Sequence, residues 1–350
     1  MNIARDFPTT AGAYRRKFGT ERQCRQYLLR DRWPDGFVCS NCLHKKAWKL
    51  ANREVWICAK CQHHWSLRAG TLFDKSPYPL TKWFEAIFEV LRSKGSVSAL
   101  ELKRVLGFGS IQTAWVWRHK IVECLGAASA MDSLGPVVQM DDWDIGARLS
   151  RKKASTSKNK VKVVGATSLQ TGVTRMQVIE DASANSIQAF MHDVLDTDVV
   201  LYTDNKASYD LCSRVAVHNI RTVSKEGRSL EAKSGLKVCD FQLGQMNMAI
   251  SLFKTRLRGT FHNGVQKRHM QAYLNEFCFQ YSRRYRGDPL LAVPDLLKAA
   301  SRMRPRTYRQ IVDSAKEKPG LPYKRLKGGR EKASSAQWWV SVARKVGLIE

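Results

Sequence analysis

Four cysteines in two close pairs constrain the fold of this chain more than any other feature. The pairs are Cys39-x-x-Cys42 and Cys58-x-x-Cys61, and 15 residues separate them. Two intervening residues let both thiolates of a pair reach one tetrahedral Zn²⁺ at about 2.3 Å, and the spacer suits a hairpin that places the second pair opposite the first. We therefore predict a zinc ribbon with one structural Zn²⁺ held by these four residues. The alternative is two reduced pairs with a redox or core role.

Aromatic and histidine side chains lie between and beside the cysteine pairs. A module of this size folds only together with its metal, and it needs a small apolar cover. That cover is expected from Trp48, Val55, Trp56 and Trp65. Four thiolates complete the coordination of zinc, so His44, His63 and His64 are expected on the surface or facing phosphate.

The chain is strongly basic. It has 59 lysine and arginine residues against 31 aspartate and glutamate residues, which gives a formal net charge of +28 and a sequence pI near 10.0. An enzyme that acts on small metabolites gains nothing from a net charge that makes the protein repel itself. A protein that binds a polyanion does gain from it, because each phosphate that it neutralises releases counterions and so favours binding. A membrane surface is the other candidate, but no apolar run approaches the roughly 18 residues of a spanning helix and no signal peptide opens the chain. Nucleic acid is therefore the expected partner, and no membrane partner is expected.

Five further cysteines are scattered in apolar contexts without the spacing of a disulfide framework. They are Cys24, Cys124, Cys212, Cys239 and Cys278. An odd total without such spacing indicates a reducing compartment and buried thiols. Together with the basic charge, this predicts a cytoplasmic, nucleoid-associated location.

The N-terminal part of the chain divides into a ribbon segment, residues 1–75, and a helical region, residues 76–127. A short helix over residues 21–29 is expected before the ribbon. The helical region opens with residues 79–91, where apolar residues recur at helical spacing behind a proline and Thr81 is the expected cap.

A helix-turn-helix is expected within the helical region. Apolar spacing predicts helices over residues 97–106 and 110–125, Gly107-Phe108-Gly109 separates them, and Ser110 can cap the second. The second helix of such a motif can enter a major groove of DNA, although an ordinary helical hairpin fits the same pattern. The residues expected on its exposed, DNA-binding face are Gln112, Thr113, Arg118, His119 and Lys120.

Residues 135–286 have a β-rich pattern, which begins after a small-residue linker near residues 126–135. The expected order is strands over 136–145, 161–168 and 174–179, a helix over 183–195, a strand over 198–203, a weak strand over 215–223, and helices over about 242–258 and 264–285. This order predicts an α/β domain in which helices cover a mixed sheet. Residues 287–350 are expected to form a basic tail, with a charge run at 324–332 and a small amphipathic helix over 334–346.

Acidic residues stand in two of the predicted strands. Asp141 lies in the first strand, and Asp204 ends another. Carboxylates at strand ends of one sheet can converge at one edge, and the paired Mg²⁺ ions of phosphoryl chemistry, about 3.5–4 Å apart, require such convergence. Either residue alone is equally compatible with a turn. Asn247, Ser251 and Lys254 share one helix face at i, i+4 and i+7, where Asn can offer a metal a neutral oxygen and Lys can hold a phosphate; the alternative is a plain polar face.

Beyond the ribbon, long runs of this sequence resemble one family. The runs are WSLRAGTLFDKSPYPLTKWFEAIF, VSALELKRVLGFGSIQTAWVWRHKI, VVQMDDWDIG, TDNKASY and NMAISLFKTRLRGTFHNGVQKRHMQAYLNEFCFQYSRR. With the ribbon they cover roughly residues 35–285 in the family's order, and the chain is similar on this basis to insertion-sequence transposases of the IS1595 type, also called ISXO2-like. The resemblance implies a ribonuclease-H-like core with a DDE-type metal site.

The resemblance also implies roles for particular residues. Asp141 matches the first acid of the family's site and Asp204 the second, and Asn247 falls where many relatives have glutamate. The family also contains a DDNK pattern, which Asn247 with Lys254 matches. Asp142 matches an acid that often follows the first, and it is expected beside the metal ligands rather than among them.

These implications predict a DNA transposase. The ribbon and helices would bind the terminal inverted repeats of the element, and the core would perform Mg²⁺-dependent strand cleavage and strand transfer, with Mn²⁺ able to substitute. The expected partners are double-stranded DNA, as element ends and as target, and further copies of the chain in a homodimer or larger assembly. The alternative from another class is a domesticated, catalytically inactive transposase that regulates by binding DNA. A ribbon protein of the transcription machinery would not explain the acidic residues.

Overall fold

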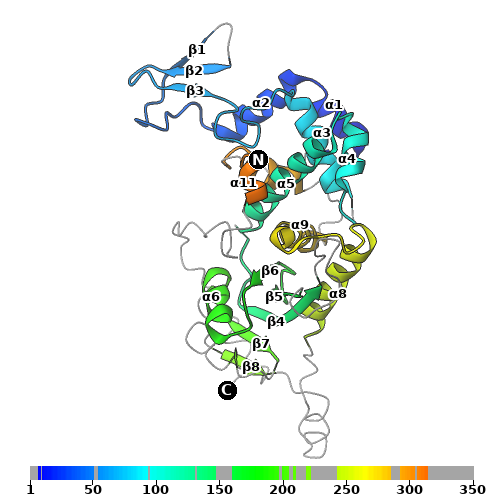
Figure 1. The fold of residues 1–350 in the computed structure, drawn as a ribbon. Helices are drawn as coiled ribbons and strands as arrows, with labels where there is room; N and C mark the ends of the chain where they lie inside the picture. Colours follow the sequence, from blue (N-terminus) through cyan, green and yellow to red (C-terminus); the bar gives the residue numbers. More distant parts are fainter. Residues whose placement is uncertain are drawn as a thin grey trace, which may run out of the picture. The chain divides into compact units, whose positions relative to one another are not determined.

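The computed structural model describes residues 7–8, 10–50, 54–93, 95–130, 132–146, 160–196, 199–204, 208–209, 218–221, 243–284, 292–303 and 306–313. The charge run at 324–332 and the helix expected over 334–346 lie outside these residues. The chain forms two compact units: the first comprises the described residues of 1–128 and 284–313, and the second those of 129–283 (Figure 1). No helix in these described segments is long and apolar enough to cross a membrane.

The first unit is mainly helical. Its helices are α1 (Ala11–Phe18), α2 (Glu21–Arg32), α3 (Leu80–Arg92), α4 (Ala99–Leu106), α5 (Ile111–Ser129), α10 (Val293–Ala300) and α11 (Tyr308–Asp313). Local signals set several of their ends. Thr20 and Gln23 form a capping box before α2. Gly107 ends α4 with a φ of +62°, a left-handed conformation that costs glycine little.

The start of α3 differs from the prediction, because Thr81 is not its cap. The helix begins at Leu80 behind Pro79, which makes no side-chain capping bond. Instead, the carboxylate of Glu21 accepts hydrogen bonds from the backbone N–H groups of Leu80 at 2.7 Å and Thr81 at 3.3 Å. A carboxylate there satisfies free N–H groups and complements the helix dipole. The cap of α3 thus comes from α2.

The chain returns to the first unit at Arg284. There α10 contacts α2 and α3 and buries its apolar face. The Leu72 N–H donates to the carbonyl of Ala300 at 2.9 Å. Arg306 Nε donates to the buried carboxylate of Glu123 in α5 at 2.7 Å. Part of the stretch 287–350, predicted as a basic tail, is therefore integral to the helical unit.

Three short strands form the ribbon within this unit. They are β1 (Ala47–Lys49), β2 (Val55–Cys58) and β3 (His64–Ser66), and they pair antiparallel in the order β1-β2-β3. The Trp33 ring at the end of α2 contacts the rings of Trp56 and Trp65, with centroids 5.5 Å and 5.0 Å away. The guanidinium of Arg32 lies 3.5 Å from the Trp65 ring centroid. These contacts attach the ribbon to α2.

The second unit is built on a mixed sheet. Its described strands are β4 (Val137–Gly146), β5 (Lys160–Ser168), β6 (Thr174–Ile179), β7 (Val200–Thr203) and β8 (His218–Arg221), in the order β6-β5-β4-β7-β8. The β4–β5 and β5–β6 pairs are antiparallel, whereas β7 is parallel to β4 and β8 is parallel to β7. The helices are α6 (Ala184–Val194), α8 (Gly244–Gly259) and α9 (Met270–Ser282). This strand order is that of a ribonuclease-H-like sheet, so the predicted α/β fold class is confirmed.

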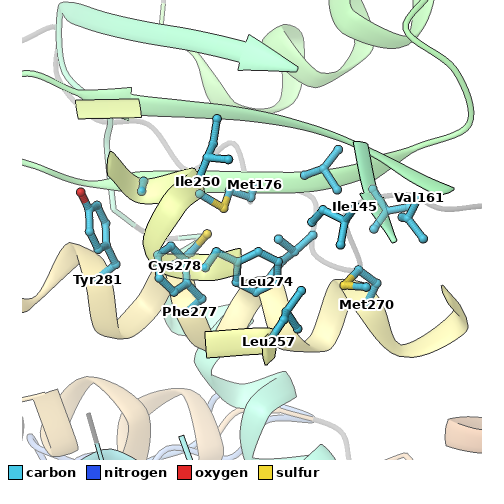
Figure 2. Packing of buried hydrophobic residues seen from close by; sticks show 14 of the residues in the cluster. Ile145, Val161, Met176, Ile250, Leu257, Met270, Leu274, Phe277, Cys278 and Tyr281 are labelled. Carbon is cyan, nitrogen blue, oxygen red and sulfur yellow. The ribbon is translucent and has the colours of Figure 1, made fainter. Parts of the chain in front are cut away.

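Helices cover both faces of this sheet. On one face, residues of β4, β5 and β7 pack against α6, with Val138, Leu201 and Phe190 among the fully buried members. On the other face, α8 and α9 pack against β4, β5 and β6 (Figure 2). Residues in this second cluster include Ile145, Val161, Met176, Ile250, Leu257, Met270, Leu274 and Phe277. The sheet therefore lies between two separate apolar layers.

Helix α9 also covers the outer edge of β6. Gln271 Oε1 accepts from the Val178 N–H at 2.8 Å, and Gln271 Nε2 donates to the Met176 carbonyl at 3.0 Å. The Thr174 N–H donates to Ser282 Oγ at 2.9 Å. Side chains thus take the place of a neighbouring strand, which protects the edge from pairing with another chain.

Two predicted boundaries are wrong. Helix α5 continues to Ser129, so the segment 126–135 is not wholly a linker. The helix predicted over 264–285 is shorter, because the 3₁₀ turn η3 (Lys267–His269) precedes α9, which begins at Met270.

Candidate functional site

The four cysteines of the ribbon converge on one point. Their sulfur atoms lie within 4.8 Å of one another, and none forms a disulfide. The Sγ–Sγ distances are 3.6 Å for Cys39–Cys61 and 3.5 Å for Cys42–Cys58. Thiolates about 2.3 Å from a tetrahedral Zn²⁺ would lie about 3.8 Å apart, so this donor set fits one zinc ion with a closed coordination shell. The predicted zinc ribbon is confirmed.

Two matching backbone turns hold the cysteine pairs. The Leu43 N–H donates to the Cys39 carbonyl at 2.9 Å, and the Gln62 N–H donates to the Cys58 carbonyl at 3.1 Å. Leu43 and Gln62 have φ angles of +58° and +56°, in the left-handed region that tightens such a turn. Each cysteine pair is therefore presented by the same local geometry.

The surroundings of the zinc site agree with the prediction in part. A hydrogen bond from the backbone N–H of His63 lowers the pKa of Cys61 to about 6, which favours the thiolate that zinc requires. His63 and His64 are exposed, as expected of histidines that are not needed as ligands. Trp48 was expected to cover the module, but it is 46% exposed, so this prediction is wrong. Trp33 supplies the contact to Trp56 and Trp65 instead.

A carboxylate cluster lies in the second unit, where β7 ends beside the middle of β4. Gln139 of β4 pairs in parallel register with Tyr202 of β7. Asp141 and Asp204 each lie two residues further along, so the continuing register brings them together. One carboxylate oxygen from each of Asp141, Asp142 and Asp204 lies within 4.8 Å of the others. Three hard oxygen donors in a chain of net charge +28 fit Mg²⁺.

Asp142 belongs to this cluster, although sequence reasoning placed it beside the ligands. Its backbone N–H donates to Asp141 Oδ1 at 2.8 Å, and its Oδ1 accepts from the Tyr209 hydroxyl at 3.1 Å. Burial first, and then the charges of the three carboxylates, raise the pKa of Tyr209, so the phenol keeps its proton and acts as a donor. The sequence signal was weak: an acid follows Asp141, and Tyr209 closes the run TDNKASY, but no pattern showed that the two would meet.

Helix α8 begins beside Asp141. Gln139 Oε1 accepts hydrogen bonds from the N–H groups of Gln245 at 3.0 Å and Met246 at 3.1 Å, in the first turn of the helix. Met246 reaches over Gly165, which is the β5 partner of Asp141. A Cβ on Gly165 would lie 2.5 Å from Met246 Cε, so glycine permits this close approach.

Asn247 and Lys254 both lie on α8. Asn247 follows Met246 and is exposed, Ser251 is exposed one turn later, and Lys254 is half-buried in the next turn. Met246, the residue before Asn247, packs over Gly165, which is the strand partner of Asp141. The first turn of a helix also favours negative charge nearby, through its N–H groups and dipole.

The predicted DNA-facing residues of α5 do not share one exposed face. Arg118 and His119 are each 1% exposed, so the prediction that they face DNA is wrong. Arg118 donates from Nε to the Val97 carbonyl at 2.8 Å and from Nη2 to Ser96 Oγ at 3.0 Å. The guanidinium thus holds the turn between α3 and α4, and the part of α5 around Arg118 and His119 belongs to the core.

The exposed part of α5 is its first turn. Gln112 is exposed, Ile111 is 51% exposed, and Thr113 is half-buried. Lys120 is also half-buried, and burial lowers its pKa against the opposing charge of Glu123. Of the predicted set, Gln112 and Thr113 are therefore the residues best placed to reach another molecule.

The comparisons with known proteins match both units. Residues 133–282 match the model described as the ISXO2-like transposase domain, and residues 19–64 match the transposase zinc-ribbon domain. A Halobacterium salinarum protein, described as an uncharacterized protein in transposable element ISH50, is 21% identical over 280 residues, which cover 74% of this chain and 90% of that protein. Among solved structures, the catalytic core domain of BIV integrase matches at 16% identity and a TM-score of 0.25, covering 40% of this chain and 80% of that chain. The transposase zinc ribbon followed by the ISXO2-like domain places this chain in the IS1595-type (ISXO2-like) transposase family.

Proposed function

We propose that this protein is a DNA transposase that binds the ends of its element and performs metal-dependent strand cleavage and strand transfer. One observation carries the proposal: oxygens of Asp141, Asp142 and Asp204 lie within 4.8 Å of one another inside the domain that matches the ISXO2-like transposase model. Like charges so close repel one another unless a cation compensates them. Mg²⁺ prefers oxygen ligands and supplies that charge, with Mn²⁺ as a substitute.

The acids and α8 divide the chemical work in this proposal. Asp141 and Asp204 would hold Mg²⁺, and the bound ion would supply activation of the attacking oxygen and stabilisation of the leaving one. Lys254 attracts a phosphate oxygen of the DNA, and Asn247 contributes a neutral amide oxygen. In cleavage, a water oxygen bonds to phosphorus as the bond to the 3′ oxygen breaks. In strand transfer, the freed 3′-OH attacks a target phosphodiester and displaces another 3′ oxygen. Neither step links DNA covalently to the protein.

Recognition of the element ends is assigned to the first unit. Gln112 stands in the exposed first turn of α5, where the second helix of a helix-turn-helix contacts base edges. Exposed lysines of the ribbon suit contacts with phosphates, which position the protein without reading sequence. They are Lys45, Lys46 and Lys60. Because an element has two ends, we expect a homodimer or larger assembly on DNA.

The test is strand transfer by the full-length, zinc-loaded protein with end DNA, a target plasmid and Mg²⁺ or Mn²⁺. Asp204→Asn should abolish joining yet preserve or tighten DNA binding, because it removes a negative charge from the site. Asp144→Asn is the matched control. It removes the same charge from an exposed residue of β4 that pairs with Lys162 at 3.2 Å, and it should leave joining intact. Normal joining by Asp204→Asn would refute the proposed site.

A second candidate function is DNA binding without chemistry, as in a domesticated transposase. Asn247 favours it, because a neutral amide attracts Mg²⁺ less than the glutamate of many relatives does. A wild-type chain that binds end DNA, is inert with both metals and gains joining activity through Asn247→Glu would identify such a relic. Joining by the wild-type chain would exclude it.

A further inference from the structure

Asp142 approaches the acidic cluster from the opposite side of the sheet to Asp141. Side chains alternate along β4, so Asp141 points with Gln139 toward α8. By the same alternation Asp142 points with Met140 toward α6. Met140 and Tyr209 both belong to the apolar cluster that packs on α6. The Tyr209 hydroxyl donates to Asp142 Oδ1 at 3.1 Å, and an oxygen of Asp142 still lies within 4.8 Å of the other two acids.

Tyr209 is a fixed donor. Its side chain is fully buried, at 0% exposure, and it lies five residues after Asp204. One short segment therefore supplies both a carboxylate of the cluster and the hydroxyl that holds Asp142. A hydrogen bond to one oxygen of a carboxylate sets the direction of the other oxygen, which is how outer partners orient metal ligands.

We propose that Asp142 is a third carboxylate ligand of the catalytic metal site and that Tyr209 is the positioning residue that orients it. This inference rests on the proposed function, because it adds a ligand to the same site. The Tyr209 hydroxyl donates to Oδ1, and the other carboxylate oxygen of Asp142 is the one that we assign to the metal. Since residue 247 is a neutral asparagine, Asp142 supplies the third negative charge that the helix α8 does not.

The test is Mn²⁺ binding to the full-length, zinc-loaded chain without DNA. Calorimetry and the electron paramagnetic resonance signal of free Mn²⁺ measure the affinity. Asp142→Asn removes the charge but keeps an acceptor for the phenol, and it should weaken Mn²⁺ binding at least tenfold. Tyr209→Phe removes only the hydroxyl and should weaken binding by about 10–100-fold, the usual effect of losing an outer partner. Unchanged affinity in Asp142→Asn would overturn its role as a ligand.

Tyr14→Phe is the matched control for the tyrosine. Tyr14 is 1% exposed, and its hydroxyl donates to the Phe84 carbonyl at 2.9 Å in the first unit. Its replacement removes the hydrogen bond of an equally buried tyrosine and should leave Mn²⁺ affinity unchanged. If Tyr209→Phe binds Mn²⁺ as tightly as Tyr14→Phe does, or if it fails to fold by circular dichroism, Tyr209 is a core residue and the positioning role is wrong.

Strand transfer measured at increasing Mn²⁺ concentrations distinguishes a role of Tyr209 in orienting Asp142 from general damage to the site. If Tyr209 only orients Asp142, Tyr209→Phe should need more Mn²⁺ for half-maximal joining but reach the wild-type rate at saturation. A lowered rate at saturating Mn²⁺ would contradict the positioning role. Failure of the proposed function has a different signature: the wild-type chain would not join DNA, while the differences in Mn²⁺ affinity between the variants would persist.

Discussion

Arg306→Ala tests whether the returning segment stabilises the first unit. Arg306 donates from Nε at 2.7 Å and also from Nη2 to the same oxygen of Glu123. The Glu123 side chain is 5% exposed and that of Arg306 is 36% exposed. Removing one partner of a fully buried pair costs about 3–5 kcal/mol, because the other charge stays buried. Arg306 is partly exposed, and the positive charge of Lys120, which lowers the pKa of Glu123, partly compensates the buried carboxylate. We therefore expect Arg306→Ala to lower the free energy of unfolding by about 2–3 kcal/mol.

This loss should depend on pH in a defined direction. Burial raises the pKa of Glu123 above its ordinary value, and the bonds from Arg306 oppose that rise. A carboxyl with a raised folded-state pKa contributes stability that is fully present below its unfolded pKa, about 4.3, and is lost as pH rises through the folded pKa. Without Arg306 the folded pKa of Glu123 rises further. The loss of unfolding free energy in Arg306→Ala relative to wild type should therefore be small near pH 4 and grow toward neutral pH.

Scanning calorimetry of the zinc-loaded chain measures the effect. For a unit of roughly 150 residues, the expected loss lowers Tm by about 4–12 °C. Arg309→Ala is the matched control, because it removes an exposed arginine from the same segment. In Arg306→Ala combined with Glu123→Gln, the extra pH dependence should disappear. A deficit at pH 7 no larger than that of Arg309→Ala, or a deficit that grows on acidification, would refute the reasoning.

Three further changes test the ribbon, the approach of α8 and the sheet edge. Cys58→Ser should eliminate the single bound Zn²⁺ in metal analysis and unfold the ribbon while the second unit keeps its unfolding transition. Gly165→Ala should cost about 1–3 kcal/mol in urea unfolding, because its Cβ would lie 2.5 Å from Met246 Cε; Met246→Val should lessen that cost in the double variant. Gln271→Leu should cost about 1–3 kcal/mol by leaving backbone groups of β6 unpaired, and light scattering should reveal more aggregation than in wild type.

The sheet of the second unit could be predicted because its signals are local. β6 has its predicted bounds, Thr174–Ile179, since Gly172 turns the chain just before it with a φ of +67°. Ser183 caps α6 through its side chain, as a helix beginning there would require. The meeting of Asp141 and Asp204 follows from equally simple geometry, because β7 runs parallel to β4 and its register with β4 places Asp204 beside Asp141.

Contacts between distant segments could not be predicted in this way. The cap of α3 comes from Glu21, which no pattern around Leu80 reveals. Arg118 was expected at the surface because charged residues usually are, but the Val97 carbonyl compensates its burial. The eight residues of α10 carry a clear apolar face, yet they lie in a stretch dominated by lysine, arginine and proline, and their partners α2 and α3 lie far away in the sequence.

The neutral side chain at residue 247 is consistent with the charge balance of the proposed site. Two Mg²⁺ ions carry four positive charges, and the carboxylates of Asp141, Asp142 and Asp204 carry three negative ones, so the loaded site keeps one positive charge for one phosphate of the DNA. With residue 247 at the metal, as proposed, a glutamate there would cancel that charge and would add a fourth carboxylate to the cluster, where like charges raise one another's pKa. Lys254 would then be drawn toward the new carboxylate and away from the phosphate. If Asp142 is held in the cluster by Tyr209, an amide at residue 247 is therefore compatible with full activity.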